Sequence, residues 1–257
     1  MRITLTLSVI LLITGCTNQV MKYPETKKIA VTDTFYGVPV DDPYRWLEDD
    51  NSAETAEWVK QQNEVTFAYL SKLPYRDKIN KRLTELWDYP KVGAPFSISK
   101  QWFVFKNNGL QNQSVLYIFD SIGAEPVLLL DPNTLSDDGT VAFSGMDVSP
   151  DGKLLVYMIA RSGSDWNEIF VMDIASRKLL SDHIQWVKFS GLACYADGFF
   201  YSAYDKPEKG QELSNRNAGQ KIFFHRYGQT QETDELVFSN PDLPQRMFSA
   251  SLNEGRN

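Results

Sequence analysis

Two stretches of the chain repeat one another: Phe143–Ile159 reads FSGMDVSPDGKLLVYMI and Phe189–Tyr204 reads FSGLACYADGFFYSAY. Each contains Phe-Ser-Gly, a short apolar run, an Asp-Gly pair and a second apolar run. Asp-Gly between two such runs is typical of a β-hairpin, because glycine readily adopts the positive φ that a tight turn needs. The repeat therefore predicts two hairpins built on one plan.

The surrounding sequence extends this plan to four strands. The first copy continues with EIFVMDI and LLSDHI before the second copy begins. A weaker copy covers Phe96–Asp131, and a further copy, FSASLNEG, begins at Phe248. Four strands at intervals of about 45 to 60 residues are typical of β-propeller blades, which stack because one sheet cannot bury both of its faces alone. An array of hairpins in a β-sandwich is the alternative.

Helices are expected only in the part before residue 90. A cap at Asn51 with Glu54 in the first turn, followed by Trp58, Val65 and Tyr69 on one face, predicts a helix from Ala53 to Leu70. A second amphipathic pattern predicts a helix from Arg76 to Trp87. We therefore expect a mainly β fold: an extended and helical segment at 16–90, then an incomplete propeller of about three blades and the opening of a fourth at 91–257.

The first residues, MRITLTLSVILLITGC, have the features of an export signal. The apolar run is shorter than the roughly 20 residues that span a bilayer. Its end resembles a bacterial lipobox, so we expect a lipoprotein signal peptide at 1–15 and lipid attachment at Cys16; an ordinary signal peptide is the alternative. Localisation is then in the bacterial envelope, on the periplasmic side, with the outer membrane favoured because Thr17 stands where Asp commonly signals inner-membrane retention.

The charge and the cysteine content argue against a nucleic-acid-binding protein and against a disulfide-stabilised protein. The net charge of −7 and the pI of about 5.0 argue against a nucleic-acid partner, since such proteins concentrate Lys and Arg on one face. The second cysteine, Cys194, lies in an apolar strand pattern. We expect it to be a small buried hydrophobe, and we expect no disulfide framework.

No catalytic residue is expected in the chain. It contains no Gly-x-Ser-x-Gly elbow, and its two histidines, His183 and His225, lie in strand-like runs, where surface or strand-edge positions are expected. Asp182 adjoins His183, but neighbouring strand residues point to opposite faces. The carboxylate pairs at 41–42, 49–50 and 137–138 fit turns better than acid-base or metal sites, so no metal site is expected.

Several segments resemble the prolyl oligopeptidase family, and prolyl endopeptidases most closely. They are GVPVDDPYRWLED (Gly37–Asp49), GSDW (Gly163–Trp166), VKFSGLACYADGFFYSAY (Val187–Tyr204) and QKIFFHRYG (Gln220–Gly228). The resemblance runs from about residue 23 to residue 257, in order. It implies a seven-bladed propeller that caps an α/β-hydrolase domain, a Ser-Asp-His triad, no metal or organic cofactor, and hydrolysis of short peptides after proline.

The same resemblance implies two substrate-binding residues, Phe189 and Met247, which would help to wall the subsite beyond the proline pocket. The alternative is that Phe189 is a repeat residue like Phe143 and that Met247 fills the core. The chain lacks the triad, so we expect it to be the gating-propeller part of a serine endopeptidase and to be inactive alone. A non-catalytic envelope propeller that binds peptides or a partner protein, or a chain that pairs with a separately encoded hydrolase, are the alternatives.

Overall fold

The computed structural model describes residues 21–212 and 216–253. The chain forms two compact units, Met1–Ile79 and Asn80–Asn257, and each is described by itself. The division falls inside α2 (Arg76–Trp87), and the change from helix to strand follows at β3 (Lys91–Val92). No helix within the described ranges is long and apolar enough to cross a membrane.

The first unit contains a hairpin and the first predicted helix. Strands β1 (Thr32–Phe35) and β2 (Val38–Asp41) pair antiparallel and lead through a short 3₁₀ helix, η1 (Arg45–Glu48), into α1 (Ala53–Leu70). Both predicted helices are confirmed with their predicted bounds. The expected cap at Asn51 is wrong by one residue: Ser52 is extended, and its Oγ accepts a hydrogen bond of 3.1 Å from the N–H of Thr55.

The carboxylate pair at 41–42 has a structural role, as expected. Asp42 accepts a hydrogen bond of 2.7 Å from Nε of Arg45, and Asp33 accepts another from the same guanidinium. The bond from Arg45 lowers the pKa of Asp42. Arg45 thus joins the hairpin to η1 at the part-exposed surface.

The second unit contains three four-stranded blades, as the repeat predicts. The first blade is β4 (Phe96–Ile98), β5 (Gln101–Asn107), β6 (Val115–Phe119) and β7 (Val127–Leu130); the second is β8 (Val141–Val148), β9 (Leu154–Arg161), β10 (Asn167–Asp173) and β11 (Leu179–Val187); the third is β12 (Ala193–Tyr195), β13 (Gly198–Ala203), β14 (Lys221–Arg226) and β15 (Glu235–Phe238). Two further 3₁₀ helices are η2 (Pro132–Thr134) and η3 (Gln231–Thr233).

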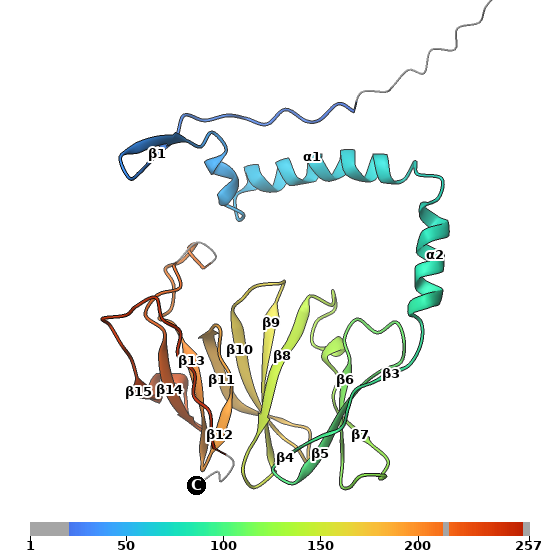
Figure 1. Cartoon of the computed structure of the whole chain (residues 1–257), viewed down its shortest axis with the longest axis vertical. Helices are drawn as coiled ribbons and strands as arrows, with labels where there is room; N and C mark the ends of the chain where they lie inside the picture. The colour runs from blue at the N-terminus through green and yellow to red at the C-terminus, as the bar shows by residue number, and fades with distance from the viewer. Residues whose placement is uncertain (1–20, 213–215, 254–257) are drawn as a thin grey trace, which may run out of the picture. The chain divides into compact units, whose positions relative to one another are not determined.

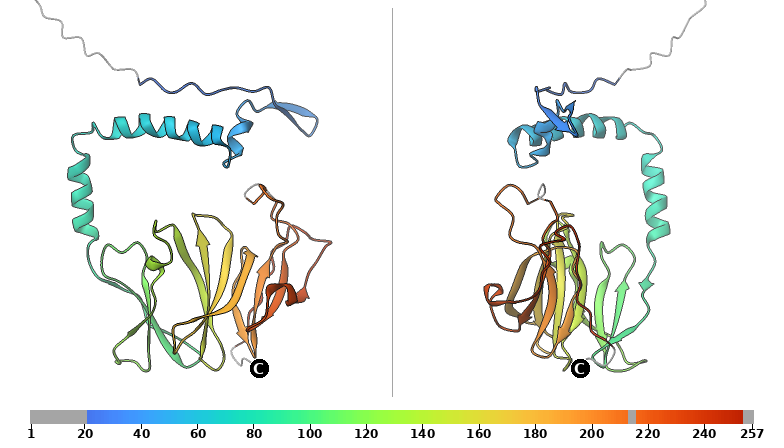
Figure 2. Two further views of the ribbon diagram at one scale, coloured as in Figure 1. Left: turned by 180° about the vertical axis from the view of Figure 1, so that it is seen from behind. Right: turned by 60° about the vertical axis from the view of Figure 1, so that its left-hand side comes forward.

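Within each blade, consecutive strands pair antiparallel, and β3 adds to the sheet of the first blade beside β5. The second and third blades form one eight-stranded sheet, because Val187 of β11 pairs with Ala203 of β13. The blades follow one another side by side in chain order (Figure 1), and the view from behind shows the same succession (Figure 2). The arrangement is that of a partial β-propeller.

Two apolar clusters lie between the blades. One joins residues of the first and second blades, among them Phe103, Leu116 and Leu155. The other joins the second and third blades and includes Ile169 and Cys194, which are fully buried. Each sheet therefore covers its neighbour, which is the reason why blades stack, and the expectation that Cys194 is a buried hydrophobe is confirmed.

A strand expected from Phe248 is not present between Phe248 and Asn253, where the structure has no regular element. In the repeat, the first strand of a blade pairs with the second strand, which follows the Asp-Gly turn. The equivalent second strand would follow Gly255, which lies outside the described residues. The first strand therefore has no ladder on which to form among the residues that are described.

Candidate functional site

Phe189 lies in the connection between the second and third blades, between β11 and β12. Its backbone has a φ of 53°, in the left-handed region that residues with a side chain rarely adopt, and 46% of the residue is exposed. Phe143, its counterpart in the repeat, is half-buried in β8 and packs edge-on against Phe105 at 5.7 Å between ring centroids. Phe189 therefore departs from the repeat, and its ring is not part of a core.

Met247 lies in the connection that follows the third blade, directly before Phe248. It is 63% exposed among the described residues. Phe248 packs edge-on against Phe238 of β15, with ring centroids 4.9 Å apart. The chain is thus fixed beside Met247 while the methionine side chain itself remains accessible.

Two buried polar side chains join the segments that carry these residues. Nε2 of Gln220 donates hydrogen bonds to the carbonyl oxygens of Lys188 (2.9 Å) and Phe189 (3.3 Å), while its Oε1 accepts one from the N–H of Phe248 (2.6 Å). Ser202 donates through Oγ to the carbonyl of Phe248 (2.8 Å) and through its N–H to Oγ of Ser190 (2.8 Å). The backbones next to Phe189 and Met247 are therefore held to one scaffold.

The surroundings of Phe189 are aromatic and cationic. The ammonium of Lys188, which is almost buried, lies 5.4 Å from the ring centroid of Phe189 and 5.0 Å from that of Trp166. Trp166 packs edge-on against Trp186 and Tyr204, at 5.6 and 6.2 Å between centroids. Such a surface offers π faces for apolar groups, while the ammonium of Lys188 also lies 3.7 Å from a carboxylate oxygen of Asp165.

The two histidines lie in different surroundings. His183 is part-exposed, lies 2.6 Å from Oε2 of Glu168 and stacks on Phe170. His225 is fully buried, so the expectation of a surface or strand-edge position is wrong for it. Its Nε2 lies 3.0 Å from Asp182 and its Nδ1 lies 2.6 Å from Asp234. Both ring nitrogens are thus occupied by carboxylates, which leaves none to activate a nucleophile.

The charge of His225 is set by its partners. Burial lowers its pKa, but the hydrogen bonds with Asp182 and Asp234 outweigh burial and raise the pKa to about 9. Burial in turn raises the pKa of Asp182, and the bonds from His225 and from the N–H of Gly228 lower it overall. The group is an imidazolium between two carboxylates, a buried charged contact between the second and third blades.

The remaining carboxylates do not gather into a metal site. Within residues 21–212 and 216–253, no three His, Cys, Asp or Glu side chains are grouped so that they could hold a metal ion. Asp138, of the pair at 137–138, accepts hydrogen bonds from the N–H and hydroxyl of Thr140, which lower its pKa. That pair has the turn role expected of it. Cys16, the expected lipid-attachment residue, lies outside the described residues.

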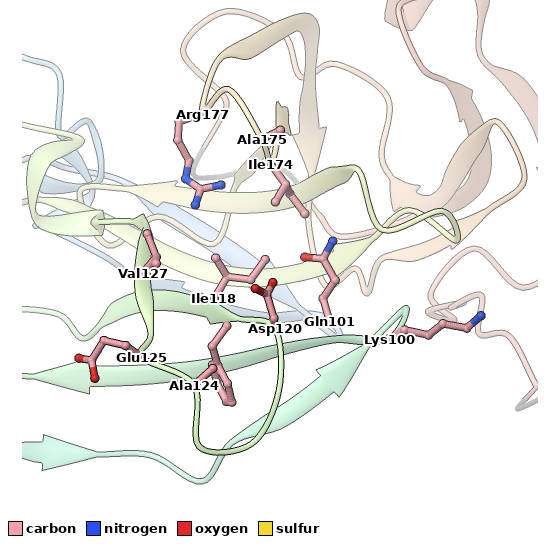
Figure 3. Close-up of a pocket in the computed structure, with 11 residues that line it drawn as sticks. Lys100, Gln101, Ile118, Asp120, Ala124, Glu125, Val127, Ile174, Ala175 and Arg177 are labelled. Carbon is pink, nitrogen blue, oxygen red and sulfur yellow. The ribbon is translucent and has the colours of Figure 1, made fainter.

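A cavity of about 360 Å³ lies elsewhere, between the first and second blades. Arg177 and Asp120 line it from opposite sides, Gln101 lies beside Asp120, and Lys100 points away (Figure 3). Oε1 of Gln101 is buried there and accepts no hydrogen bond. Neither Phe189 nor Met247 lines this cavity.

Gln220 and Ser202, which join the segments that carry Phe189 and Met247, are not among the residues predicted from the sequence. A signal exists in the repeat: Gln113 precedes the third strand of the first blade as Gln220 precedes the third strand of the third blade. Oε1 of Gln113 accepts a hydrogen bond from the N–H of Phe143, as Oε1 of Gln220 does from Phe248. Aligning the third strands of the blades, and not only the first two, would have revealed this shared glutamine.

The repeated four-stranded sheets, stacked face to face, define a β-propeller segment. Residues 23–256 match the family model described as "Prolyl oligopeptidase, N-terminal beta-propeller domain". The chain therefore belongs to the prolyl oligopeptidase family, as the sequence segments indicated.

Individual relatives agree with this assignment. The chain is 43% identical over 238 residues to a prolyl endopeptidase of Elizabethkingia meningoseptica, with 92% of this chain and 34% of the relative covered. It is 35% identical over 268 residues to prolyl oligopeptidase A of Amanita bisporigera, with 90% and 35% covered.

Among solved structures, prolyl oligopeptidase B of Galerina marginata, bound to a 25mer macrocyclization substrate, matches with a TM-score of 0.76 at 28% identity, over 91% of this chain and 36% of that one. A prolyl endopeptidase structure matches with a TM-score of 0.60 at 36% identity, with 91% and 34% covered. The chain thus spans about a third of the length of the relatives that it matches.

Proposed function

We propose that the chain is the N-terminal, gating-propeller portion of a prolyl oligopeptidase-type serine endopeptidase that hydrolyses short peptides after proline. Phe189 and Met247 contact the peptide, and a separate α/β-hydrolase domain with a Ser-Asp-His triad carries the chemistry. The observation that carries this proposal is the exposure of both side chains on segments that Gln220 and Ser202 join. Exposed apolar side chains on such a fixed backbone are suited to ligand contact.

The proposal has a direct test with the chain as it is. We expect the purified 257-residue chain to bind the blocked peptide acetyl-Phe-Gly-Pro-amide and to leave Gly-Pro-p-nitroanilide uncleaved. The substitutions Phe189→Ala and Met247→Ala should each weaken peptide binding, by about 1 to 2 kcal/mol, since a fully buried apolar side chain contributes about 1.5 to 3 kcal/mol. Phe143→Ala is the control, because Phe143 packs on Phe105 rather than facing outward.

Two results would contradict the proposal. Cleavage of the chromogenic substrate above a mock preparation would mean that these residues contain a catalytic site. Equal loss of peptide binding in the Phe143 and Phe189 variants would mean that Phe189 acts only through stability. Peptide binding without cleavage in the natural full-length product as well would favour the alternative, a non-catalytic envelope module.

We also propose that the chain is exported and lipid-anchored through Cys16 in the bacterial envelope, with the outer membrane favoured. Support comes from the sequence alone, in the apolar run and the lipobox-like end of residues 1–16. Expression in a bacterial host should give a membrane-bound chain with acyl mass on Cys16. The variant Cys16→Ala should lose that mass; a membrane-free wild-type chain would contradict the proposal.

A further inference from the structure

We propose that Gln220 is a positioning residue of the peptide-binding surface, whose side-chain amide sets the place of Phe189 relative to Met247. The inference rests on the proposed function, because it concerns the two residues assigned there to the peptide. It goes further in naming a residue that touches neither the peptide nor the reacting atoms. Gln220 would act only through the backbone of the two segments to which it is hydrogen-bonded, at residues 188–189 and at Phe248.

The hydrogen bonds of Gln220 are suited to this role. Its two N–H donors go to two successive carbonyl oxygens, of Lys188 and Phe189, at 2.9 and 3.3 Å. Its oxygen accepts from the N–H of Phe248 at 2.6 Å. An amide side chain has two donors and one carbonyl acceptor, so both ends of the group are in use. One planar group thus fixes two chain segments that lie far apart in sequence.

Burial makes this link persistent. Gln220 is 1% exposed, so water does not compete for its donors or its acceptor. A buried amide that loses its partners is left unsatisfied, which favours the conformation in which all its bonds are made. The side-chain amide of Gln220, together with the bonds of Ser202, therefore holds the two segments at a fixed distance.

Phe189 needs such support because of its backbone. A φ of 53° is unfavourable for a residue with a side chain, and such conformations persist only where neighbouring groups hold them. The carbonyl of Phe189 is one of the two acceptors of Gln220. Loss of that bond should let the connection relax toward extended backbone, which turns the ring away from its present direction.

Gln113 provides a matched comparison within the same chain. Its Nε2 donates to the carbonyl of Val141 at 2.6 Å, and its Oε1 accepts from the N–H of Phe143 at 2.9 Å. It therefore also links two blades through a side-chain amide, but both of its bonds go to β8, and the phenylalanine that it holds is half-buried there and packs on Phe105. A purely structural role for such glutamines predicts equal effects of the two substitutions on peptide binding.

The experiment compares Gln220→Met with Gln113→Met, since methionine keeps the length of glutamine and removes its hydrogen bonds. The 257-residue chain is labelled with ¹⁵N-phenylalanine and titrated with acetyl-Phe-Gly-Pro-amide. The label reports the backbone amides of the phenylalanines, among them Phe143, Phe189 and Phe248. In Gln220→Met we expect shifts of the Phe189 and Phe248 amides and peptide binding at least fivefold weaker. In Gln113→Met we expect a shift at Phe143 and binding within twofold of wild type.

A third variant separates the donors of Gln220 from its acceptor. Gln220→Glu keeps an oxygen for the N–H of Phe248 and loses both donors, so it should shift the Phe189 amide, leave Phe248 near its wild-type position and weaken peptide binding. Equal effects of Gln220→Met and Gln113→Met on binding, or unchanged binding in both Gln220 variants, would overturn the inference.

Failure of the proposed function itself is distinguishable. If the wild-type chain binds no peptide, the function proposed for Phe189 and Met247 is wrong. The positioning role is then judged on the free chain: coupled shifts of the Phe189 and Phe248 amides in Gln220→Met support it, and unchanged amides overturn it.

Discussion

The Nε2 atom of His225 lies 3.0 Å from Oδ1 of Asp182, so a histidine of the third blade is paired with an aspartate of the second. Both side chains are inaccessible to solvent. On the other side of the ring, Asp234 contacts Nδ1 at 2.6 Å and accepts a hydrogen bond of 2.6 Å from the hydroxyl of Tyr201. Neighbouring blades are thus joined by a buried charged network as well as by apolar packing.

This network predicts a loss of stability in mildly alkaline solution. The pKa of His225 rises from 6.5 to about 9 in the folded chain. Because the pKa of His225 is raised in the folded chain, its charged form contributes to the free energy of unfolding. This contribution is fully present below pH 6.5 and is lost as the pH rises to about 9. Since each tenfold change in proton affinity corresponds to about 1.4 kcal/mol, the loss is on the order of 3 kcal/mol. Urea unfolding between pH 6 and pH 9.5 measures it.

Two histidine variants test whether His225 causes this dependence of the unfolding free energy on pH. His225→Gln should flatten the dependence of unfolding free energy on pH between 6.5 and 9, although the chain is less stable throughout. His183→Gln is the control, because His183 is part-exposed and lies beside Glu168 rather than in the buried network. A slope that survives in His225→Gln would show that another group titrates.

Removing one carboxylate of the network should destabilise the chain strongly. Asp182→Asn leaves the buried imidazolium with one negative partner instead of two, and breaking a buried ion pair from one side costs about 3 to 5 kcal/mol. Asp197→Asn is the control: it removes an exposed ion pair with Arg226, which is expected to contribute less than about 1 kcal/mol. Equal effects in the two variants, measured by urea unfolding, would contradict a charged network.

The sequence predicted the fold well because its signals are local. The Asp-Gly pair at 151–152 has the positive φ expected of a turn glycine, 75° at Gly152, and the strands on both sides of it form as predicted. The interval of about 45 to 60 residues between copies of the repeat then corresponds to four strands in each blade. The error at the cap of α1 is equally local: Asn51 and Ser52 are both good capping residues, and only the backbone angles distinguish them.

The candidate site was predicted less completely, because the side chains that hold its backbone in place come from distant parts of the chain. Phe189 and Met247 were named from resemblance, but nothing near them in sequence points to Gln220. The buried position of His225 was not predicted for the same reason. Its partner Asp182 is 43 residues away, and a strand pattern does not show which polar residue faces a buried partner. Such pairs are fixed by the stacking of blades rather than by the sequence around each residue.

A glycine of the third blade should be sensitive to a single methyl group. A Cβ at Gly198 would clash with the backbone carbonyl of His225 and lie within 2.7 Å of the ring of Phe224. Gly198→Ala is therefore expected to destabilise the chain by at least about 2 kcal/mol, because backbone cannot move aside cheaply. Gly191→Ala, whose Cβ would meet nothing within 4 Å, is the matched control and should change stability by less than about 0.5 kcal/mol.

The backbone of Phe189 gives the last prediction. At a φ of 53°, alanine and phenylalanine pay the cost of the left-handed conformation, about 1 to 2 kcal/mol, and glycine does not. Because glycine also loses more freedom on folding, the net expectation is that Phe189→Gly is more stable than Phe189→Ala by about 1 kcal/mol. Urea unfolding of both variants measures the difference. A more stable alanine variant would mean that residue 189 leaves the left-handed region once its ring is gone, and that the ring itself, with Lys188 beside it at 5.4 Å, helps to hold that conformation.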